Sequence, residues 1–459
     1  MPTNDTIAAL ATPIGQAGIG IIRVSGPLSL GIAKEVFRPK NRGFDPRSHH
    51  LCFGHLYDPS SGTTLDEVLL TFMKAPHSYT REDIIEINSH SGYTLLYKIL
   101  KIVLAQGARL ARPGEFTLRA FLNGRIDLTQ AEAVIDLINS QSERGLHLAS
   151  LQVQGIFRAK IDALCQNAIN VLAHVEAVID FPEEEVGIMS KKDVSRVIEE
   201  DLIKPIQSLI EAHSSRIWVD GVNTVIVGRV NAGKSSLLNL LLNEQRAIVT
   251  STPGTTRDVI ESTINLDGLP LCLTDTAGFG EIKNEVERIG IHLTRKRLAK
   301  ADFLLVVIDQ SRPLAQDDLN IIAHSQGKKA LIVINKIDLP CKINREAEQR
   351  AFGGMPVVRI SALTGQGLDQ LRKAIKDCIV EGEPDLSSSQ AAPNLRHREA
   401  LSDALQFFKD AGLKTREGAP MEIVALEFSS GLDALGGITG KTTSEDVLDR
   451  IFSRFCLGK

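Results

Sequence analysis

The 459-residue sequence has no apolar stretch long enough to span a bilayer, and it has little excess charge. Its formal net charge is −4, so no global basic field attracts nucleic acid, and any RNA contact is expected at a local patch. The six cysteines are scattered without a CxxC pair, which argues against structural zinc and favours a reducing compartment. Residues 1–5 lack the basic segment of a secretion signal and the arginines of a transit peptide. These absences predict a cytoplasmic protein that does not associate with membranes.

The chain is long enough for about three domains, and its 43% hydrophobic and 24% charged residues are ordinary for a globular protein. Residues 1–118 are strand-rich, because short apolar runs at 6–10, 20–24 and 83–87 predict strands. Residues 93–105 have the periodicity of an amphipathic helix. We therefore expect an α+β domain at 1–118.

Helical periodicity dominates residues 119–215, where TQAE at 129–132 predicts a capping box and 145–179 a long helical run. Residues 381–394 have the composition of a linker. Beyond it the helical pattern resumes at 395–408, 421–435 and 444–455. The economical interpretation is one all-α domain, 119–215 and 381–459, interrupted by an α/β domain at 216–380. Two separate helical modules are the alternative.

The run GRVNAGKSS at residues 228–236 follows an apolar run at 222–227 that predicts a strand. It precedes an apolar-periodic run at 237–242 that predicts a helix. Strand, glycine-rich turn and helix together are typical of a phosphate-binding loop, whose backbone N–H groups form an anion nest at the helix N-terminus. Lys234 would add a charge on the β and γ phosphates, and the Ser235 hydroxyl would reach Mg²⁺.

Three further motifs follow in order, each at the end of an expected strand. Asp275 can hold Mg²⁺ through water, and Gly278 lets the backbone approach the γ-phosphate. Asp338 can accept two hydrogen bonds from guanine, whereas adenine would leave this carboxylate unpaired. The backbone of residues 361–363 can donate to the guanine O6 atom.

The four motifs predict a GTP site on a parallel α/β sheet, a P-loop GTPase fold. The expected GTP-binding residues are Asn231, Ala232, Gly233, Lys234, Ser235, Ser236, Thr250, Ser251, Thr252, Pro253, Gly254, Thr255, Thr256, Asp275, Thr276, Ala277, Gly278, Asn335, Lys336, Asp338, Ser361, Ala362 and Leu363.

Residues 254–258 lie where a switch loop is expected, and Thr256 is the expected second hydroxyl ligand of Mg²⁺; a polar surface loop is the alternative. Phe279 stands where Ras-like enzymes have the Gln that orients the attacking water. The Asn231 amide, with carbonyls of the loop at 250–255, could instead hold a monovalent cation where an arginine finger would otherwise act. Glu287 could orient the water, or it could belong to a solvated helix face.

Two further features have two interpretations each. The basic residues between Arg288 and Lys300 are either a local RNA patch or a solvated helix face. Cys456, close to the last residue of the sequence, is either an inert or docked thiol, or a thiol that contributes to a site.

The chain resembles, from end to end, the MnmE (TrmE) family of tRNA-modifying GTPases. The resemblance is carried by TIAALATP at 6–13, ARPGEFT at 111–117, RAFLNGRIDL at 119–128, IDFPEEE at 179–185, the phosphate loop, GTTRD at 254–258 and FCLGK at 455–459. Many GTPases share the phosphate and base motifs. The arginine-rich stretches and the cysteine tail are far more particular to this family.

The resemblance implies an N-terminal domain that binds a tetrahydrofolate derivative, in the 5-formyl or methylene form, and forms a homodimer. It implies an FAD-dependent partner, MnmG (GidA), in a heterotetramer-type complex. Together they modify the wobble uridine of certain tRNAs at carbon five with an aminomethyl-type group. It also implies G domains that dimerise across K⁺ during GTP hydrolysis.

The resemblance also implies roles for individual residues. Arg125 stands where lysine also occurs, so the charge is kept while the geometry differs. The implied sites are K⁺ at Asn231, Thr250, Thr252 and Thr255; Mg²⁺ at Ser235 and Thr256; the water-orienting residue Glu287; folate contacts at Arg23, Glu86, Arg125 and Lys459; and Cys456 in the modification itself.

Two other functions fit parts of the sequence. One is a ribosome-assembly GTPase switch that binds rRNA, for which the basic run up to Lys300 is the support. The other is a folate-dependent one-carbon enzyme whose GTPase is only regulatory.

Overall fold

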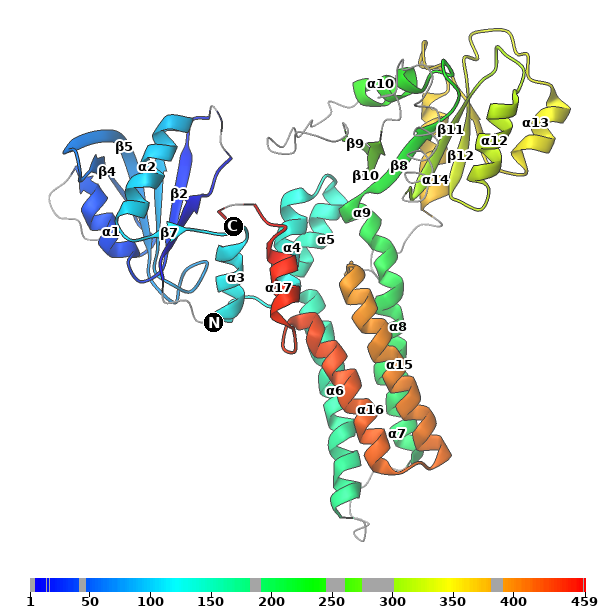
Figure 1. The fold of residues 1–459 in the computed structure, drawn as a ribbon. Helices are drawn as coiled ribbons and strands as arrows, with labels where there is room; N and C mark the ends of the chain where they lie inside the picture. Colours follow the sequence, from blue (N-terminus) through cyan, green and yellow to red (C-terminus); the bar gives the residue numbers. More distant parts are fainter. Residues whose placement is uncertain are drawn as a thin grey trace, which may run out of the picture. The chain divides into compact units, whose positions relative to one another are not determined.

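The computed structural model describes residues 5–13, 15, 17–40, 47–181, 191–244, 261–274, 301–380, 391–456 and 458–459 (Figure 1). It divides into two compact units. The first unit comprises Met1–Ile135, Gln152–Ser208 and Arg396–Lys459, and the second comprises Asp136–Leu151 and Leu209–Leu395.

The first unit contains a seven-stranded sheet in the order β3-β4-β5-β6-β2-β1-β7. Most neighbours pair antiparallel, while β1 and β7 pair parallel. Helices α1 and α2 contribute apolar side chains to one core with the sheet, in which Ile99 and Val103 of α2 are buried together with Ile85 and Ile87 of β6. The bounds are β1 (Ile7–Leu10), β2 (Gly20–Ser25), α1 (Ser29–Val36), β3 (Phe37–Pro39), β4 (Leu51–Asp58), β5 (Thr63–Met73), β6 (Ile84–Ser89), α2 (Tyr93–Ala105) and β7 (Arg109–Leu110).

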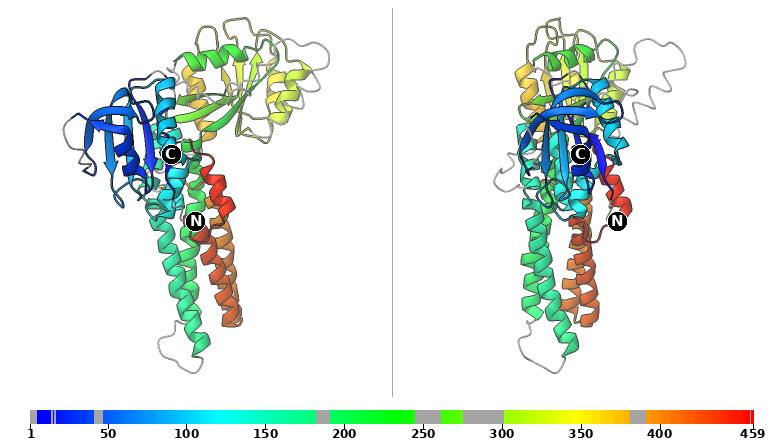
Figure 2. Two further views of the ribbon diagram at one scale, coloured as in Figure 1. Left: turned by 60° about the vertical axis from the view of Figure 1, so that its left-hand side comes forward. Right: turned by 90° about the vertical axis from the view of Figure 1, so that its left-hand side faces the viewer.

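The rest of the first unit is helical. Helix α6 packs against α16, which follows it by more than two hundred residues and runs along it in the bundle of Figure 2. Gly431 of α16 faces the Phe408 ring of α15, where a Cβ would be 2.7 Å from the ring. The bounds are α3 (Glu115–Leu122), α4 (Leu128–Asn139), α6 (Ile156–Asp180), α7 (Lys191–Val197), a π-helix (Ile198–Ile203), α8 (Lys204–Glu211), α15 (Leu395–Glu417), α16 (Met421–Thr439) and α17 (Glu445–Phe452). The last residues of α4 and α8, and most of α5 (Glu143–Val153), belong to the second unit. Helices that precede and follow residues 209–395 in the sequence therefore form one bundle, as the interrupted-domain interpretation predicts.

The predicted capping box at 129–132 is wrong by two residues. Asp127 is the capping residue: its carboxylate accepts from the Gln130 N–H at 2.9 Å, and its own N–H donates to the Gln130 side chain at 3.1 Å. The Thr129 hydroxyl donates to Asp127 instead. Aspartate caps helices as well as threonine does, so the helix begins at Leu128 and Glu132 is free to face the bundle.

The second unit contains a six-stranded sheet in the order β13-β12-β11-β8-β10-β9. The β9 strand pairs antiparallel with β10, and the remaining pairs are parallel. Apolar side chains on both faces are buried, Leu305 and Val333 in one core and Val306 and Ile332 in the other, which explains the continuous apolar runs. The bounds are α9 (Ile217–Asp220), β8 (Val222–Val227), α10 (Lys234–Glu244), β9 (Glu261–Leu266), β10 (Leu269–Thr274), β11 (Phe303–Asp309), α12 (Gln316–Ser325), β12 (Ala330–Asn335), α13 (Arg345–Phe352), β13 (Val357–Arg359) and α14 (Leu368–Ile379).

The strand order of the second unit positions its loops. Strand β8 is flanked by β11 on one side and β10 on the other, so the chain order reverses direction at β8. In open parallel sheets, ligands bind at the carboxyl ends of strands beside such a reversal. The predicted phosphate loop leaves β8 at this point. None of the helices in the described ranges has the length and apolarity that crossing a membrane requires.

Candidate functional site

In the turn after β8, positions 228 and 233 have no room for a side chain. A Cβ on Gly228 would lie 2.3 Å from the Val307 carbonyl oxygen of β11. A Cβ on Gly233, whose φ is +98°, would lie 2.1 Å from the Asn335 amide nitrogen. Asn231 also has a positive φ, of +67°. These positions explain why the loop needs glycines at its start and at its junction with α10.

Lys234 is the first residue of α10 and turns back onto the loop. Its ammonium donates to the carbonyls of Gly228 and Arg229, at 2.9 Å each. The positive end of the helix and this ammonium both favour an anion at the loop. Ser235 follows on the first turn of α10 and is exposed. The arrangement is that of a phosphate cradle with a hydroxyl beside it.

Asn335 joins the phosphate loop to the two base motifs. Its amide nitrogen donates to the Ala232 carbonyl at 2.9 Å, and its amide oxygen accepts from the Lys336 and Ala362 N–H groups at 2.8 and 2.9 Å. The side chain is 2% exposed, so these bonds form away from water. Three segments predicted separately are thereby held in one network.

Lys336 and Asp338 extend this network. The Lys336 ammonium donates to the Asn231 carbonyl at 2.8 Å and to Asp309 at 2.6 Å. The Asp338 carboxylate accepts from the Ser361 hydroxyl at 2.6 Å. One oxygen of Asp338 is therefore engaged and orients the carboxylate, which leaves its second oxygen to accept from a base.

Asp309, which ends strand β11, was not predicted from the sequence. Burial raises its pKa, but the hydrogen bonds from Lys336 and Ser311 outweigh burial and hold the pKa below its usual range. An ionised Asp309 fixes the Lys336 ammonium under the loop. The signal was available, because an acidic residue closes the apolar run at 303–309.

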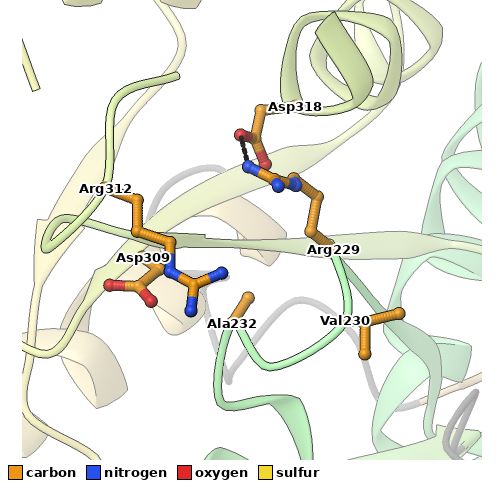
Figure 3. A pocket seen from close by; sticks show the side chains of 6 residues that line it. All are labelled: Arg229, Val230, Ala232, Asp309, Arg312 and Asp318. Atoms are coloured by element: carbon orange, nitrogen blue, oxygen red, sulfur yellow. Dashed lines mark hydrogen bonds and ion pairs between the residues drawn. The ribbon is translucent and has the colours of Figure 1, made fainter. Parts of the chain in front are cut away.

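A small polar pocket lies beside the loop (Figure 3). Arg229 reaches from the loop to Asp318 of α12, with 3.3 Å between the guanidinium and the carboxylate. Asp318 also accepts from the Ala315 N–H at the start of that helix. The pocket is lined by Arg229, Val230, Ala232, Asp309, Arg312 and Asp318.

Several predicted residues lie outside the part of the chain that the structure describes. Of the implied K⁺ ligands Asn231 is described, and of the implied Mg²⁺ ligands Ser235. The remaining candidates outside the described ranges are Thr250, Ser251, Thr252, Pro253, Gly254, Thr255, Thr256, Asp275, Thr276, Ala277, Gly278, Glu287 and the basic residues at 288–300.

A second cluster forms in the first unit around Arg23 of β2. Its guanidinium pairs with Glu86 of β6 at 2.7 Å, and the two residues are partners in the sheet register. The same group lies 5.7 Å from the ring centroids of Tyr79 and Phe116. Arg125 also lies over the Tyr79 ring, 4.6 Å from its centroid, and donates to the Tyr79 carbonyl.

The C-terminal residues join this cluster. Arg23 donates to the Gly458 carbonyl at 3.2 Å, and the Lys459 N–H donates to the Cys456 carbonyl. Burial lowers the pKa of Lys459, and the nearby Arg23 lowers it further. The structure therefore brings together Arg23, Glu86 and Lys459, reaches Arg125 through Tyr79, and holds an exposed Cys456 in the same turn. Tyr79 was missed because no local pattern marks it.

Two family models match the chain. One, described as the GTP-binding protein TrmE N-terminus, matches residues 6–125, and the other, described as the MnmE helical domain, matches residues 128–456. A tRNA modification GTPase MnmE of Geotalea uraniireducens (strain Rf4) is 44% identical over 464 residues, covering 100% of both chains. The protein of the same name from Geobacillus kaustophilus (strain HTA426) is 44% identical over 463 residues, with the same coverage.

Among solved structures, the G domain of the T. maritima FeoB iron transporter is 27% identical and spans 35% of this chain and 99% of that chain, at a TM-score of 0.27. So low a TM-score adds nothing to the fold argument, which rests on strand order and loop geometry. The full-length matches and the family models agree with the phosphate loop and base network. The chain therefore belongs to the MnmE family of tRNA-modification GTPases and is a GTP hydrolase.

Proposed function

We propose that this chain hydrolyses GTP in a K⁺-dependent way to drive modification of the tRNA wobble uridine at carbon five. The modification adds an aminomethyl-type group and takes its carbon from a tetrahydrofolate derivative. The observation that carries the GTP half is the Asn335 side chain, which ties the phosphate loop to both base motifs. The observation that carries the folate half is the cluster of Arg23, Glu86 and Lys459.

We assign a different task to each domain. Residues 1–118 would bind folate and dimerise, 119–215 with 381–459 would form the helical domain carrying the cysteine tail, and 216–380 would be the G domain. Guanine selectivity would follow from the Asp338 carboxylate, because guanine offers it two adjacent donors and adenine offers no such pair. Ser235 and Thr256 would hold Mg²⁺, which neutralises charge on the phosphates during transfer.

The proposed K⁺ ligand Asn231 has a suitable setting. Its backbone has a positive φ, its carbonyl is occupied by Lys336, and the residue is exposed. Positive φ at a residue other than glycine is a feature of functional loops. Thr250, Thr252 and Thr255 would complete the K⁺ site, and Glu287 would orient the attacking water. Equal hydrolysis rates in K⁺ and in Na⁺ would reject this mechanism.

The folate cluster has the chemistry of its proposed ligand. A carboxylate, Glu86, can accept from the pterin donors, while Arg23, Arg125 and Lys459 can meet the glutamyl tail or the formyl group. Cys456, exposed in the same turn, would take part in the modification. The FAD-dependent partner MnmG would supply the redox chemistry in a heterotetramer-type complex with a homodimer of this chain. Because the substrate is tRNA, we place this work in the cytoplasm.

Nucleoside analysis of tRNA from a deletion strain tests the proposal as a whole. The wobble uridines that normally carry the group should lack it, and the wild-type gene should restore it. Unchanged wobble uridines would reject our proposal, and defective ribosome assembly in the same strain would then favour an rRNA-binding switch. Folate turnover without a flavin partner would favour a one-carbon enzyme.

A further inference from the structure

The C-terminal turn is seated against the first strand of the sheet through Gly458. This residue is buried, with a φ of +93°. A Cβ there would lie 2.0 Å from the Leu10 carbonyl oxygen, 2.8 Å from the Leu10 carbonyl carbon and 2.9 Å from the Ala11 Cα. All three atoms are backbone, at the end of a strand paired to β2, so they cannot move aside as a flexible side chain could. Glycine is required for this approach.

The same residue is hydrogen-bonded to Arg23, a side chain held by several contacts. The Gly458 carbonyl accepts from Arg23, whose guanidinium is fixed by Glu86 and by two aromatic rings. Through Arg23 and Glu86, strands β2 and β6 therefore hold the C-terminal turn in position.

A second close approach holds the chain just before the turn. A Cβ on Gly114, whose φ is +69°, would lie 2.5 Å from the Phe452 carbonyl oxygen and 3.1 Å from the Phe455 Cβ. Phe452 and Phe455 are buried in an apolar cluster with Leu128. Cys456 is thus exposed between two buried anchors, Phe455 and Gly458.

We propose that Gly458 is a positioning residue for the tRNA-modification step, because it locks the C-terminal turn onto the sheet and so fixes Cys456, which lies in the same turn as Lys459. This rests on the proposed function of Cys456 and of the folate cluster. Gly458 itself offers no reactive group. Because it has no side chain, it lets the backbone of the turn contact the backbone of Leu10 and Ala11.

The test is Gly458→Ala in the full-length protein, assayed with its flavin partner on unmodified tRNA. The modification rate should fall about 10²-fold, the size expected for a misplaced reacting group. GTP hydrolysis should remain that of the wild type. Gly31→Ala is the matched control, because a Cβ at Gly31 meets nothing within 4 Å, and it should leave every readout unchanged.

A second measurement reports the position of the turn itself. Because Phe455 is buried, we expect the peptide bond between Arg454 and Phe455 to be protected from trypsin. Gly458→Ala should speed loss of the last five residues about tenfold, measured by mass spectrometry. Unchanged protection together with a normal modification rate would overturn the positioning role.

Cys456→Ser separates the two hypotheses. If Cys456→Ser abolishes modification while Gly458→Ala retains it, the proposed function stands and the positioning role fails. If Cys456→Ser retains full modification, the proposed function of the thiol fails. If both variants lose modification and both hydrolyse GTP normally, both are supported.

Discussion

The nucleotide site of the second unit and the folate cluster of the first are assembled from opposite kinds of sequence. The phosphate loop is nine consecutive residues, 228–236, and successive strands deliver the base motifs in chain order. In the first unit, Arg23 bonds to a residue 435 positions away. A site made of contiguous motifs can be predicted from spacing, whereas a site made by long-range closure cannot.

The same contrast holds for what stabilises each unit. The parallel sheet of the second unit is buried on both faces by aliphatic side chains. The first unit also relies on ion pairs between distant segments. Arg396 forms a two-pronged pair with Glu132, at 3.0 and 2.7 Å, and His397 lies 2.7 Å from the same carboxylate. These residues are 264 and 265 positions apart.

The largest expected effect is on stability, from Glu132→Ala. Removing one partner of a largely buried ion pair costs about 3–5 kcal/mol, because Arg396 and His397 lose their counter-charge. The free energy of unfolding of the first unit, measured by denaturant titration, should fall by that amount. Glu399→Ala, at an exposed position of α15, is the control and should leave the free energy of unfolding unchanged.

The same variant should also change how the free energy of unfolding depends on pH. Burial raises the pKa of Glu132, but His397 and Arg396 outweigh burial and hold the pKa well below its ordinary value of 4.5. A lowered pKa in the folded state contributes stability that is present above 4.5 and is lost as the pH falls below it. The wild type should therefore lose more stability than Glu132→Ala as the pH falls below 4.5. Parallel pH curves for the two proteins would contradict this account.

The next effect is on hydrolysis, from Lys234→Ala. Losing the ammonium from the phosphate loop should lower the rate of GTP hydrolysis about 10²–10³-fold, as for loss of one donor to a developing charge. Folate binding to the first unit, measured by calorimetry, should be unchanged. Lys373→Ala, on the surface of α14, should hydrolyse GTP normally. A parallel loss of folate binding would show that the two sites are not independent.

Glu86→Gln changes the folate cluster and leaves the nucleotide site intact. It removes the charge from the carboxylate that would accept from the pterin donors, and hydrogen bonds to charged groups are worth about 1.5–3 kcal/mol. Affinity for a tetrahydrofolate derivative should therefore fall roughly 10–100-fold, by calorimetry, while GTP hydrolysis stays normal. Undiminished folate affinity would remove Glu86 from the site.

The sequence predicted the elements that periodicity marks and missed those that it does not. Helix α2 begins and ends at the predicted residues, 93 and 105, and the strand before the phosphate loop at 222–227 is also confirmed. The central strand β11 was missed although its apolar run is unbroken, because no motif residue drew attention to it. The β4–β5 hairpin was missed because its partly exposed faces blur the alternation.

Side-chain partners were the least predictable. Glu132 was assigned to a helix cap, since a glutamate three residues after a threonine fits that pattern locally. Its actual partners, Arg396 and His397, follow the second unit in the sequence, and the folded bundle brings them to Glu132. The Arg23 cluster was reached through a family resemblance, because no spacing along the chain relates residue 23 to residue 459.

The smallest expected effect comes from Arg125→Lys, which asks how far the folate cluster extends. Arg125 touches the cluster through Tyr79, by lying over the ring and bonding to the carbonyl. Lysine keeps the charge but loses the planar contact, and a cation over an aromatic ring at an exposed site is worth about 0.5–1 kcal/mol. Folate affinity should fall a few-fold, with GTP hydrolysis unchanged. A loss as large as that of Glu86→Gln would mean that Arg125 bonds to the ligand through its guanidinium fork. No change at all would restrict the cluster to Arg23, Glu86 and Lys459, the residues gathered where the C-terminal turn meets the sheet.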